Sequence, residues 1–310
     1  MENIMTIKEL SALWKADKQQ YVKRSTLSAY TIILENHILP AFGDKCQLME
    51  SEIQEFALGK LQSGLTQKTV KDMLIVLKMV MKFGSRTGLL PAVDWHVRYP
   101  TDQKKHELEI LSVTHFQILL QYVRDNFSFR NLGIFICLTT GMRIGEVCAL
   151  KWSDIDLINE TISVNRTIER IYLIKDNERR TELVIDTPKS RNSIRIIPIS
   201  KELMKLVRPL KKMVNENNYI LSNELRPSEP RTYRNYFKLL LKRLGIPDIK
   251  FHGLRHSFAT RCIEAHCDYK TLSAILGHSN ITTTLNLYVH PNLDQKKKCI
   301  NEMMKSLYKK

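Results

Sequence analysis

LGHSNITTTLNLYVH at residues 276–290 is one of three stretches that decide how this sequence is interpreted, the others being HGLRHSFAT at 252–260 and TTGMRIGE at 139–146. Any one of them alone would be weak evidence, because arginine or histidine near glycine occurs often by chance. His252 and Arg255 are three residues apart, a spacing that places both on one face of a helix. The three stretches in this order therefore predict a site assembled from distant parts of the chain.

Around these stretches, helices and a few short strands are expected. A helix is predicted to begin at Ser112, to break at Gly141 and to resume over 144–150. Three short segments are rich in β-branched residues, namely 161–168, 183–187 and 194–199. The turn-like sequence PKSRNS separates the last two segments, so we predict a small antiparallel sheet in a mainly helical domain.

The first hundred residues are predicted to form a small helical bundle. Thr6 and Glu9 form a capping box, and Ser25 is expected to cap a segment that closes at Pro40 and Gly43. Further on, apolar residues recur at helical spacing and give one face of several turns: Val70, Met73, Leu74, Leu77 and Met81. The polar residues 99–107 read as a linker, which predicts domains at 1–105 and 106–310.

The charge of the chain favours a polyanionic partner. Among 310 residues, 48 are Lys or Arg and 32 are Asp or Glu, which gives a net charge of +16 and a pI of about 9.5. The net charge is +4 over 1–105 and +12 over 106–310. No long apolar run or basic amphipathic anchor is found, so we expect a nucleic acid rather than a membrane as the partner.

The N-terminus indicates where the protein is located, and the cysteines indicate whether it binds a metal. MENIMTIKEL lacks the features of a secretory signal, so a cytoplasmic location is expected. The six cysteines are scattered without a CxxC pair, which indicates reduced, mostly core residues. Cys262, His266 and Cys267 lie close together, but no second ligand pair follows them. We therefore expect no zinc site and no cofactor.

Together the three stretches resemble the tyrosine recombinase, or phage integrase, family. The resemblance covers the whole second domain, and the first domain is similar in length and helical pattern to the family's core-binding domain. It implies a mainly α fold with a small antiparallel β-sheet. It also implies an N-terminal helical, SAM-like core-binding bundle and a C-terminal α+β catalytic domain that ends in a tail.

The chemistry that this family performs requires particular side chains. Cutting DNA by transesterification needs a nucleophile, positive charge around a pentavalent phosphorus, and an acid for the leaving 5′ oxygen. The resemblance assigns Tyr288 as the nucleophile that becomes linked to DNA. Arg143 and Arg255 would hold the non-bridging oxygens, because a guanidinium is a planar, permanently charged donor. Glu146 would orient Arg143 from behind.

The remaining roles fall to imidazoles and to a lysine. Between the two family histidines, His252 is the favoured base and His278 the favoured donor to the phosphate. His256 and His290 are interpreted as capping or core residues. Lys189 lies in the TPKS turn, where the family carries a mobile lysine that protonates the 5′ oxygen. The resemblance implies that neither metal nor ATP is needed.

The expected partners are double-stranded DNA and three further copies of the chain. Recombination joins two duplexes and four strands, so a homotetramer on paired sites is expected. Its contacts are assigned to the C-terminal tail, whose apolar residues Ile300, Met303, Met304 and Leu307 form a helical stripe. Two alternatives are a non-catalytic helix-turn-helix regulator, suggested by 270–288, and a type IB topoisomerase. Integration, excision, resolution and inversion are left open.

Overall fold

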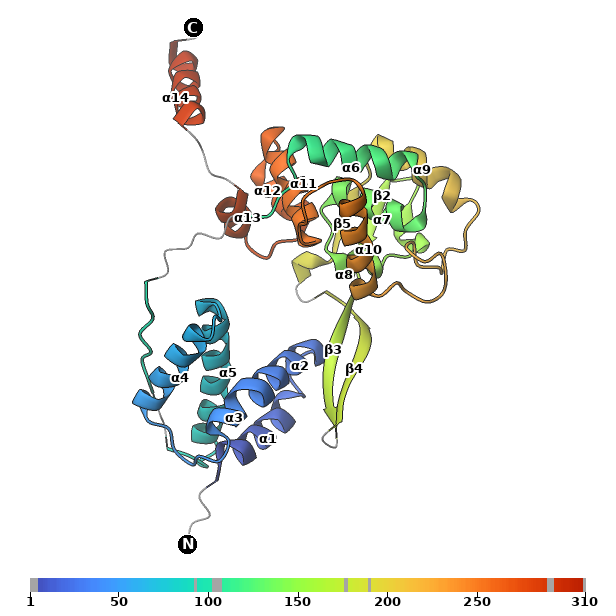
Figure 1. The fold of residues 1–310 in the computed structure, drawn as a ribbon. Coiled ribbons are helices and arrows are strands. Elements are labelled where there is room, and N and C mark those ends of the chain that lie inside the picture. The colour runs from blue at the N-terminus through green and yellow to red at the C-terminus, as the bar shows by residue number, and fades with distance from the viewer. Residues whose placement is uncertain are drawn as a thin grey trace. The chain divides into compact units, whose positions relative to one another are not determined.

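Figure 1 shows the fold in a computed structural model, which describes residues 5–91, 94–101, 108–175, 178–188, 191–288 and 293–308. Contacts within the chain divide it into two compact units. The first comprises Met1–His106 with Arg170–Val184, and the second comprises Glu107–Glu169 with Ile185–Lys310. None of the described helices is long and apolar enough to cross a membrane.

The first unit is built on a helical bundle. Its helices are α1 (Ile7–Lys18), α2 (Arg24–Ile33), α3 (Leu39–Phe42), α4 (Glu50–Gln62) and α5 (Gln67–Arg86), with a π-helical turn at Leu34–Ile38. The predicted capping box at the start of α1 is confirmed, since Glu9 N donates to Thr6 Oγ1 and Thr6 N donates to Glu9 Oε2. The predicted apolar face lies on α5, and all five of its residues are buried in the core of this unit.

Two local predictions in this bundle need correction. Ser25 does not cap α2, because the chain leaves the extended conformation at Lys23 and Ser25 already lies in the first helical turn. The predicted stop at Pro40 is also wrong, because the π-helical turn leads directly into α3. Pro40 stands in the first turn of that segment, where a missing N–H is tolerated. Gly43 is the C-cap of α3, as expected.

A hairpin of β3 (Thr167–Lys175) and β4 (Glu178–Asp186) forms a separate two-stranded sheet. Within the first unit its backbone meets α2, where Tyr172 N donates to Ser28 Oγ at 2.7 Å. An exposed Arg24 guanidinium also binds both carboxylate oxygens of Glu182, at 3.3 and 2.6 Å. These contacts explain why part of the hairpin groups with the helical bundle.

The second unit surrounds the buried helix α7 (Phe129–Thr140). Around it lie α6 (Val113–Asp125), α8 (Ile144–Cys148), α9 (Lys201–Lys211), α10 (Pro230–Arg243), α11 (His252–Glu264), α12 (Tyr269–Leu276) and α13 (Ile281–Tyr288), and α14 (Leu293–Tyr308) follows (Figure 1). The predicted helix start at Ser112 is confirmed, because its hydroxyl accepts from His115 N. Helix α7 packs against α8 and α11, so it connects two of the elements that carry the predicted site.

The sheet of this unit has the order β1-β2-β5, from β1 (Ile155–Asp156), β2 (Thr161–Val164) and β5 (Arg195–Pro198). Strands β2 and β5 are antiparallel, with Thr161 opposite Pro198 and Val164 opposite Arg195. The predicted mainly α fold with antiparallel sheets is confirmed, but the expected hairpin around PKSRNS is wrong. β4 pairs with β3, its neighbour in sequence, and β5 returns to the edge of β2.

Gly141 ends α7, as predicted, in the left-handed conformation with φ of 64°. A Cβ at this position would lie 2.6 Å from Phe258 Cδ1 and 2.7 Å from Leu276 Cδ2. The carbonyl of Gly141 accepts a hydrogen bond from Arg255 Nη1 at 3.0 Å. The glycine therefore lets the end of α7 approach α11 and α12 closely enough to hold an arginine of the predicted site.

Replacing Gly141 by alanine is expected to lower the free energy of unfolding by about 2–4 kcal/mol, from the left-handed backbone together with the crowding of Phe258 and Leu276. Gly245 is a matched control, because it has φ of 65° but no atom within 4 Å of an added Cβ. Gly245→Ala should lower the free energy of unfolding only by the strain of the left-handed backbone, about 1–2 kcal/mol. Urea unfolding measures both, and equal losses would refute the packing argument.

Candidate active site

The carboxylate of Glu146 is the centre of the site. It lies in the first turn of α8, where Oε2 accepts from the backbone N of Arg143 at 2.8 Å and Oε1 accepts from Arg143 Nη1 at 2.7 Å. The Glu146 side chain is only 2% exposed. A buried charge of this kind is stable only when it is paired and hydrogen-bonded.

Arg195 on β5 is the second arginine that binds the carboxylate of Glu146. Its Nη1 and Nη2 donate to the two carboxylate oxygens of Glu146 at 3.0 and 2.9 Å, and its Nε donates to the carbonyl of Ile275 at 2.6 Å. Burial by itself raises the pKa of Glu146, but the hydrogen bonds and charges of Arg195 and Arg143 outweigh it, so the pKa lies below its ordinary value. Sequence reasoning did not give Arg195 this role.

Arg255 lies on α11 and is 2% exposed. One of its terminal nitrogens donates to Gly141, but the other, Nη2, is buried without a hydrogen-bond partner in the described part of the chain. Burial, followed by the charge of Arg143, lowers the pKa of Arg255 to about 9. An unsatisfied buried donor of this kind indicates a missing acceptor.

The predicted histidines lie in the same field of positive charge. Burial, and then the charges of Arg255 and Arg143, lower the pKa of His278 to about 4. His252 is partly exposed at the start of α11, yet burial, His256 and the same arginines lower its pKa to about 4 as well. Both imidazoles are therefore neutral at pH 7. The charges of Arg143 and Arg255 act on both imidazoles, so these four residues lie in one region of the structure.

The turn between α12 and α13 positions His278. Gly277 has φ of 69°, and a Cβ there would lie 2.9 Å from the carbonyl oxygen of Asn192. Its own carbonyl accepts from Arg143 Nη2 at 3.3 Å, which ties this turn to α8. On the following residue, His278 Nδ1 hydrogen-bonds Thr284 Oγ1 at 2.8 Å, leaving the other ring nitrogen for a ligand.

Tyr288 ends α13 and is 8% exposed. Its ring packs against a small apolar cluster formed by Ala259, Leu272 and Leu276. Burial raises the pKa of its phenol, while the charges of Arg255 and Arg143 oppose that rise. The phenolic oxygen lies 2.7 Å from Nδ1 of His256, a residue interpreted from sequence as capping or core. This contact is one that the sequence analysis missed.

A cavity of about 420 Å³ opens beside these groups. Arg143, Glu146 and His278 line it, together with the hydroxyl residues Thr167, Ser193, Ser279 and Thr283. Pro188 also lines it, whereas the predicted acid Lys189 lies outside the described residues. Cations, hydroxyls and a turn backbone are the groups that hold phosphate oxygens in proteins.

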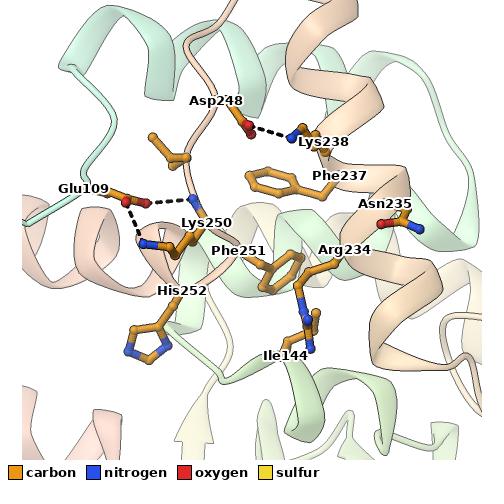
Figure 2. A pocket seen from close by; sticks show the side chains of 11 residues that line it. Glu109, Ile144, Arg234, Asn235, Phe237, Lys238, Asp248, Lys250, Phe251 and His252 are labelled. Carbon is orange, nitrogen blue, oxygen red and sulfur yellow. Dashed lines mark hydrogen bonds and ion pairs between the residues drawn. The ribbon is translucent and has the colours of Figure 1, made fainter. Parts of the chain in front are cut away.

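A larger cavity of about 580 Å³ lies between α10 and the segment that leads into α11, with His252 at its edge. Figure 2 shows that four of its charged side chains form two ion pairs. Lys238 Nζ lies 2.9 Å from Asp248 Oδ2, and Lys250 Nζ lies 2.9 Å from Glu109 Oε1. Both lysines of this cavity are thus already neutralised, and Arg234 also lines it.

The cysteines take no part in this arrangement. The five whose side chains are described are free: Cys137 and Cys148 are buried, Cys46 and Cys262 are half-buried, and Cys267 is exposed. The expectation that most lie in the core is thus too broad. Among the described residues, no group of three or more His, Cys, Asp or Glu side chains is placed to hold a metal ion.

The chain belongs to the phage integrase family, because the pattern of that family matches residues 111–295, more than half of its length. The pattern of the family's N-terminal SAM-like domain matches residues 6–57. Members of this family are tyrosine-type DNA strand transferases that act in site-specific recombination. The predicted family, fold class and enzyme class are confirmed, which leaves the regulator and the topoisomerase without support.

Similar proteins include a XerC-like tyrosine recombinase of Caldanaerobacter subterraneus subsp. tengcongensis, 28% identical over 84% of this chain and 72% of its own length. The ICEBs1 integrase of Bacillus subtilis is 27% identical over 83% of this chain and 72% of its own.

Among solved structures, the Tn1549 transposon integrase in complex with a circular intermediate DNA has a TM-score of 0.75 at 23% identity, covering 96% of this chain and 99% of that one. A lambda integrase tetramer bound to a Holliday junction has a TM-score of 0.63 at 17% identity, covering 93% of this chain and 78% of that one. At these identities, the likeness shows a shared fold.

Glu146→Gln is expected to lower the free energy of unfolding by about 3–5 kcal/mol at neutral pH, because it leaves Arg195 buried without its anion. The folded state holds the pKa of Glu146 below its ordinary value of 4.5, so this stabilisation is present above that value. It is lost as pH falls through the lowered pKa, and the unfolding curves of the two proteins should converge in acid.

Glu202→Gln serves as the control, because its ion pair with Lys205 joins two exposed side chains. It should change stability far less than Glu146→Gln does, because a surface ion pair is screened by solvent and contributes little. Urea titrations of all three proteins at several pH values measure the effect. The assigned ion pairs would be contradicted if Glu146→Gln lowered the free energy of unfolding by the same amount at every pH in the acid range.

Proposed function

We propose that this chain cuts and rejoins DNA through Tyr288, which attacks one phosphodiester to give a 3′-phosphotyrosine and a free 5′ hydroxyl. Arg143 and Arg255 hold the non-bridging oxygens as negative charge builds on them. His278 donates a hydrogen bond to the same phosphate from its free ring nitrogen, and His252 acts beside it. One imidazole of the site accepts the proton of the tyrosine.

The unpaired Nη2 of Arg255 is the observation that carries this proposal. Three guanidinium groups surround the single carboxylate of Glu146, so the cluster keeps an excess of positive charge. A phosphodiester supplies both the negative charge and the acceptors that this cluster lacks. Water supplies no charge, which makes it a poor substitute.

Lys189 is proposed as the acid that protonates the leaving 5′ oxygen. An ammonium group on a flexible stem suits this step, because it has to reach an oxygen whose charge appears only as the bond breaks. The bond energy is kept in the phosphotyrosyl link, so a 5′ hydroxyl of a second strand can reverse the reaction. The cycle closes without ATP.

Tyr288→Phe should abolish the covalent protein–DNA adduct on a substrate nicked near the crossover, because no other residue is proposed to attack phosphorus. DNA binding should remain. Tyr269→Phe, at an exposed tyrosine on α12, should form the adduct as the unchanged chain does. Denaturing gels of labelled DNA give the readout, and an adduct that survives Tyr288→Phe would overturn the assignment.

We propose a larger assembly and its setting as well. The helical bundle at 1–105 and the catalytic domain at 106–310 would hold duplex DNA from opposite sides, with Lys and Arg contacts to the backbone supplying most of the affinity. Binding should weaken steeply with salt. Such a reaction on cellular DNA suits a cytoplasmic protein, and four copies would act on two paired sites.

The tail is the proposed contact between copies. On α14, Ile300 is 60% exposed and Leu307 is 69% exposed, with Met303 and Met304 on the same stripe. An amphipathic helix with an exposed apolar face is stabilised by covering that face. A neighbouring protomer is the partner that recombination brings next to it.

Deleting residues beyond Asn292 should therefore abolish recombination more than DNA binding. Ile300→Asp should reduce recombination by roughly tenfold or more, since a buried aliphatic side chain contributes about 1.5–3 kcal/mol. Asn301→Asp adds the same charge one residue on, off the apolar stripe, and should have little effect. Recombination yield and filter binding measure the two activities, and equal loss of both after deletion would count against the tail's role.

A further inference from the structure

A hydrogen bond joins the proposed nucleophile to His256. Its Nδ1 lies 2.7 Å from the phenolic oxygen of Tyr288, and the two ring centres are 5.6 Å apart. His256 follows His252 by one helical turn on α11, and their rings meet edge to face at 4.6 Å. No hydrogen bond joins His252 to Tyr288 in the described part of the chain.

The surroundings decide which of the two groups holds the proton. Burial, and then the charge of Arg255, lower the pKa of His256, so its imidazole is neutral at pH 7. Burial raises the pKa of Tyr288, so the phenol keeps its proton. We therefore assign the O–H of Tyr288 as donor and the Nδ1 lone pair of His256 as acceptor.

We propose that His256 is a further catalytic residue, whose Nδ1 accepts the phenolic proton as the oxygen of Tyr288 bonds to phosphorus. The inference rests on the proposed function, in which Tyr288 is the nucleophile. It replaces His252 with His256 as the immediate acceptor and leaves His252 beside the phosphate.

The bonds and protons of the step balance. The O–H bond of Tyr288 breaks, its electron pair forms the bond to phosphorus, and the proton passes to His256. The bond from phosphorus to the 5′ oxygen breaks, and that oxygen takes a proton from the acid proposed at Lys189. In rejoining, a 5′ hydroxyl attacks phosphorus and gives its proton back to the amine proposed at Lys189. The bond from phosphorus to the phenolic oxygen breaks, and protonated His256 returns its proton to that oxygen.

A neutral acceptor at this place removes a specific obstacle. A phenol with an ordinary pKa of about 10 is a poor nucleophile at neutral pH, and burial makes its ionisation harder. An acceptor already within hydrogen-bond distance lets the proton leave as the new bond forms. Arg255 and Arg143 then face the developing negative charge, since both act on the phenol.

The test is single-turnover cleavage of the nicked substrate by the full chain. His256→Asn keeps a hydrogen-bonding atom near the place of Nδ1 but has no basic nitrogen, and His256→Gln is a second variant should the first unfold. Cleavage should slow by roughly 10²–10⁴-fold. His266→Asn is the matched control, because His266 is an exposed histidine just beyond the end of α11. It should cleave at the unchanged rate.

A second arm separates proton transfer from packing. Replacing Tyr288 by a fluorinated tyrosine with a phenol pKa below neutral removes the need for an acceptor. The defect of His256→Asn should then shrink at least tenfold. A defect of the same size with both nucleophiles would mean that His256 only supports the ring of Tyr288, and would overturn the inference.

The outcomes also distinguish the two levels of the proposal. An adduct that forms without Tyr288, or no adduct from the unchanged chain, sinks the proposed function itself. An adduct that requires Tyr288 but forms at full speed with His256→Asn sinks the role of His256 alone.

Discussion

The shared carboxylate of Glu146 is the interaction on which the site depends. It accepts hydrogen bonds from Arg143 beside α8 and from Arg195 on β5, and Arg195 continues to the carbonyl of Ile275 on α12. Three segments far apart in sequence are thus joined through one buried anion. Without it, two guanidinium groups would repel each other in a region of low dielectric, where charges interact strongly.

The same pairing leaves the site with unbalanced charge. The single carboxylate of Glu146 neutralises only one of the three guanidinium charges. The remaining positive charge shifts the pKa values of the neighbouring side chains. Burial, and then these charges, lower the pKa values of His278 and His252, and burial together with the charge of Arg143 lowers the pKa of Arg255. In the proposed reaction, the phosphodiester completes the balance, which places the strongest stabilisation where charge develops. In that proposal, the same positive charge also attracts the phosphodiester to the site.

Local signals in the sequence predicted helix ends more reliably than strand partners. Thr6, Ser112 and Gly141 act as predicted because a cap or a left-handed turn depends on neighbouring residues only. The prediction for Ser25 failed because α2 begins after Lys23, whose side chain makes no capping hydrogen bond, so no capping signal marks the start of this helix. The pairing of β5 with β2 was missed because strand pairing is decided by distant packing, which a turn-like sequence does not reveal.

The sequence by itself determined the family and the helical character of the chain, and it singled out Arg143 and Arg255, since the order and spacing of the motifs carry that information. Only the tertiary structure decided what surrounds each of them. Arg195 reaches Glu146 across 49 positions, and His256 reaches Tyr288 across 32. Such contacts depend on how α11, α13 and β5 pack, so residue type alone could not separate His256 from an ordinary core histidine.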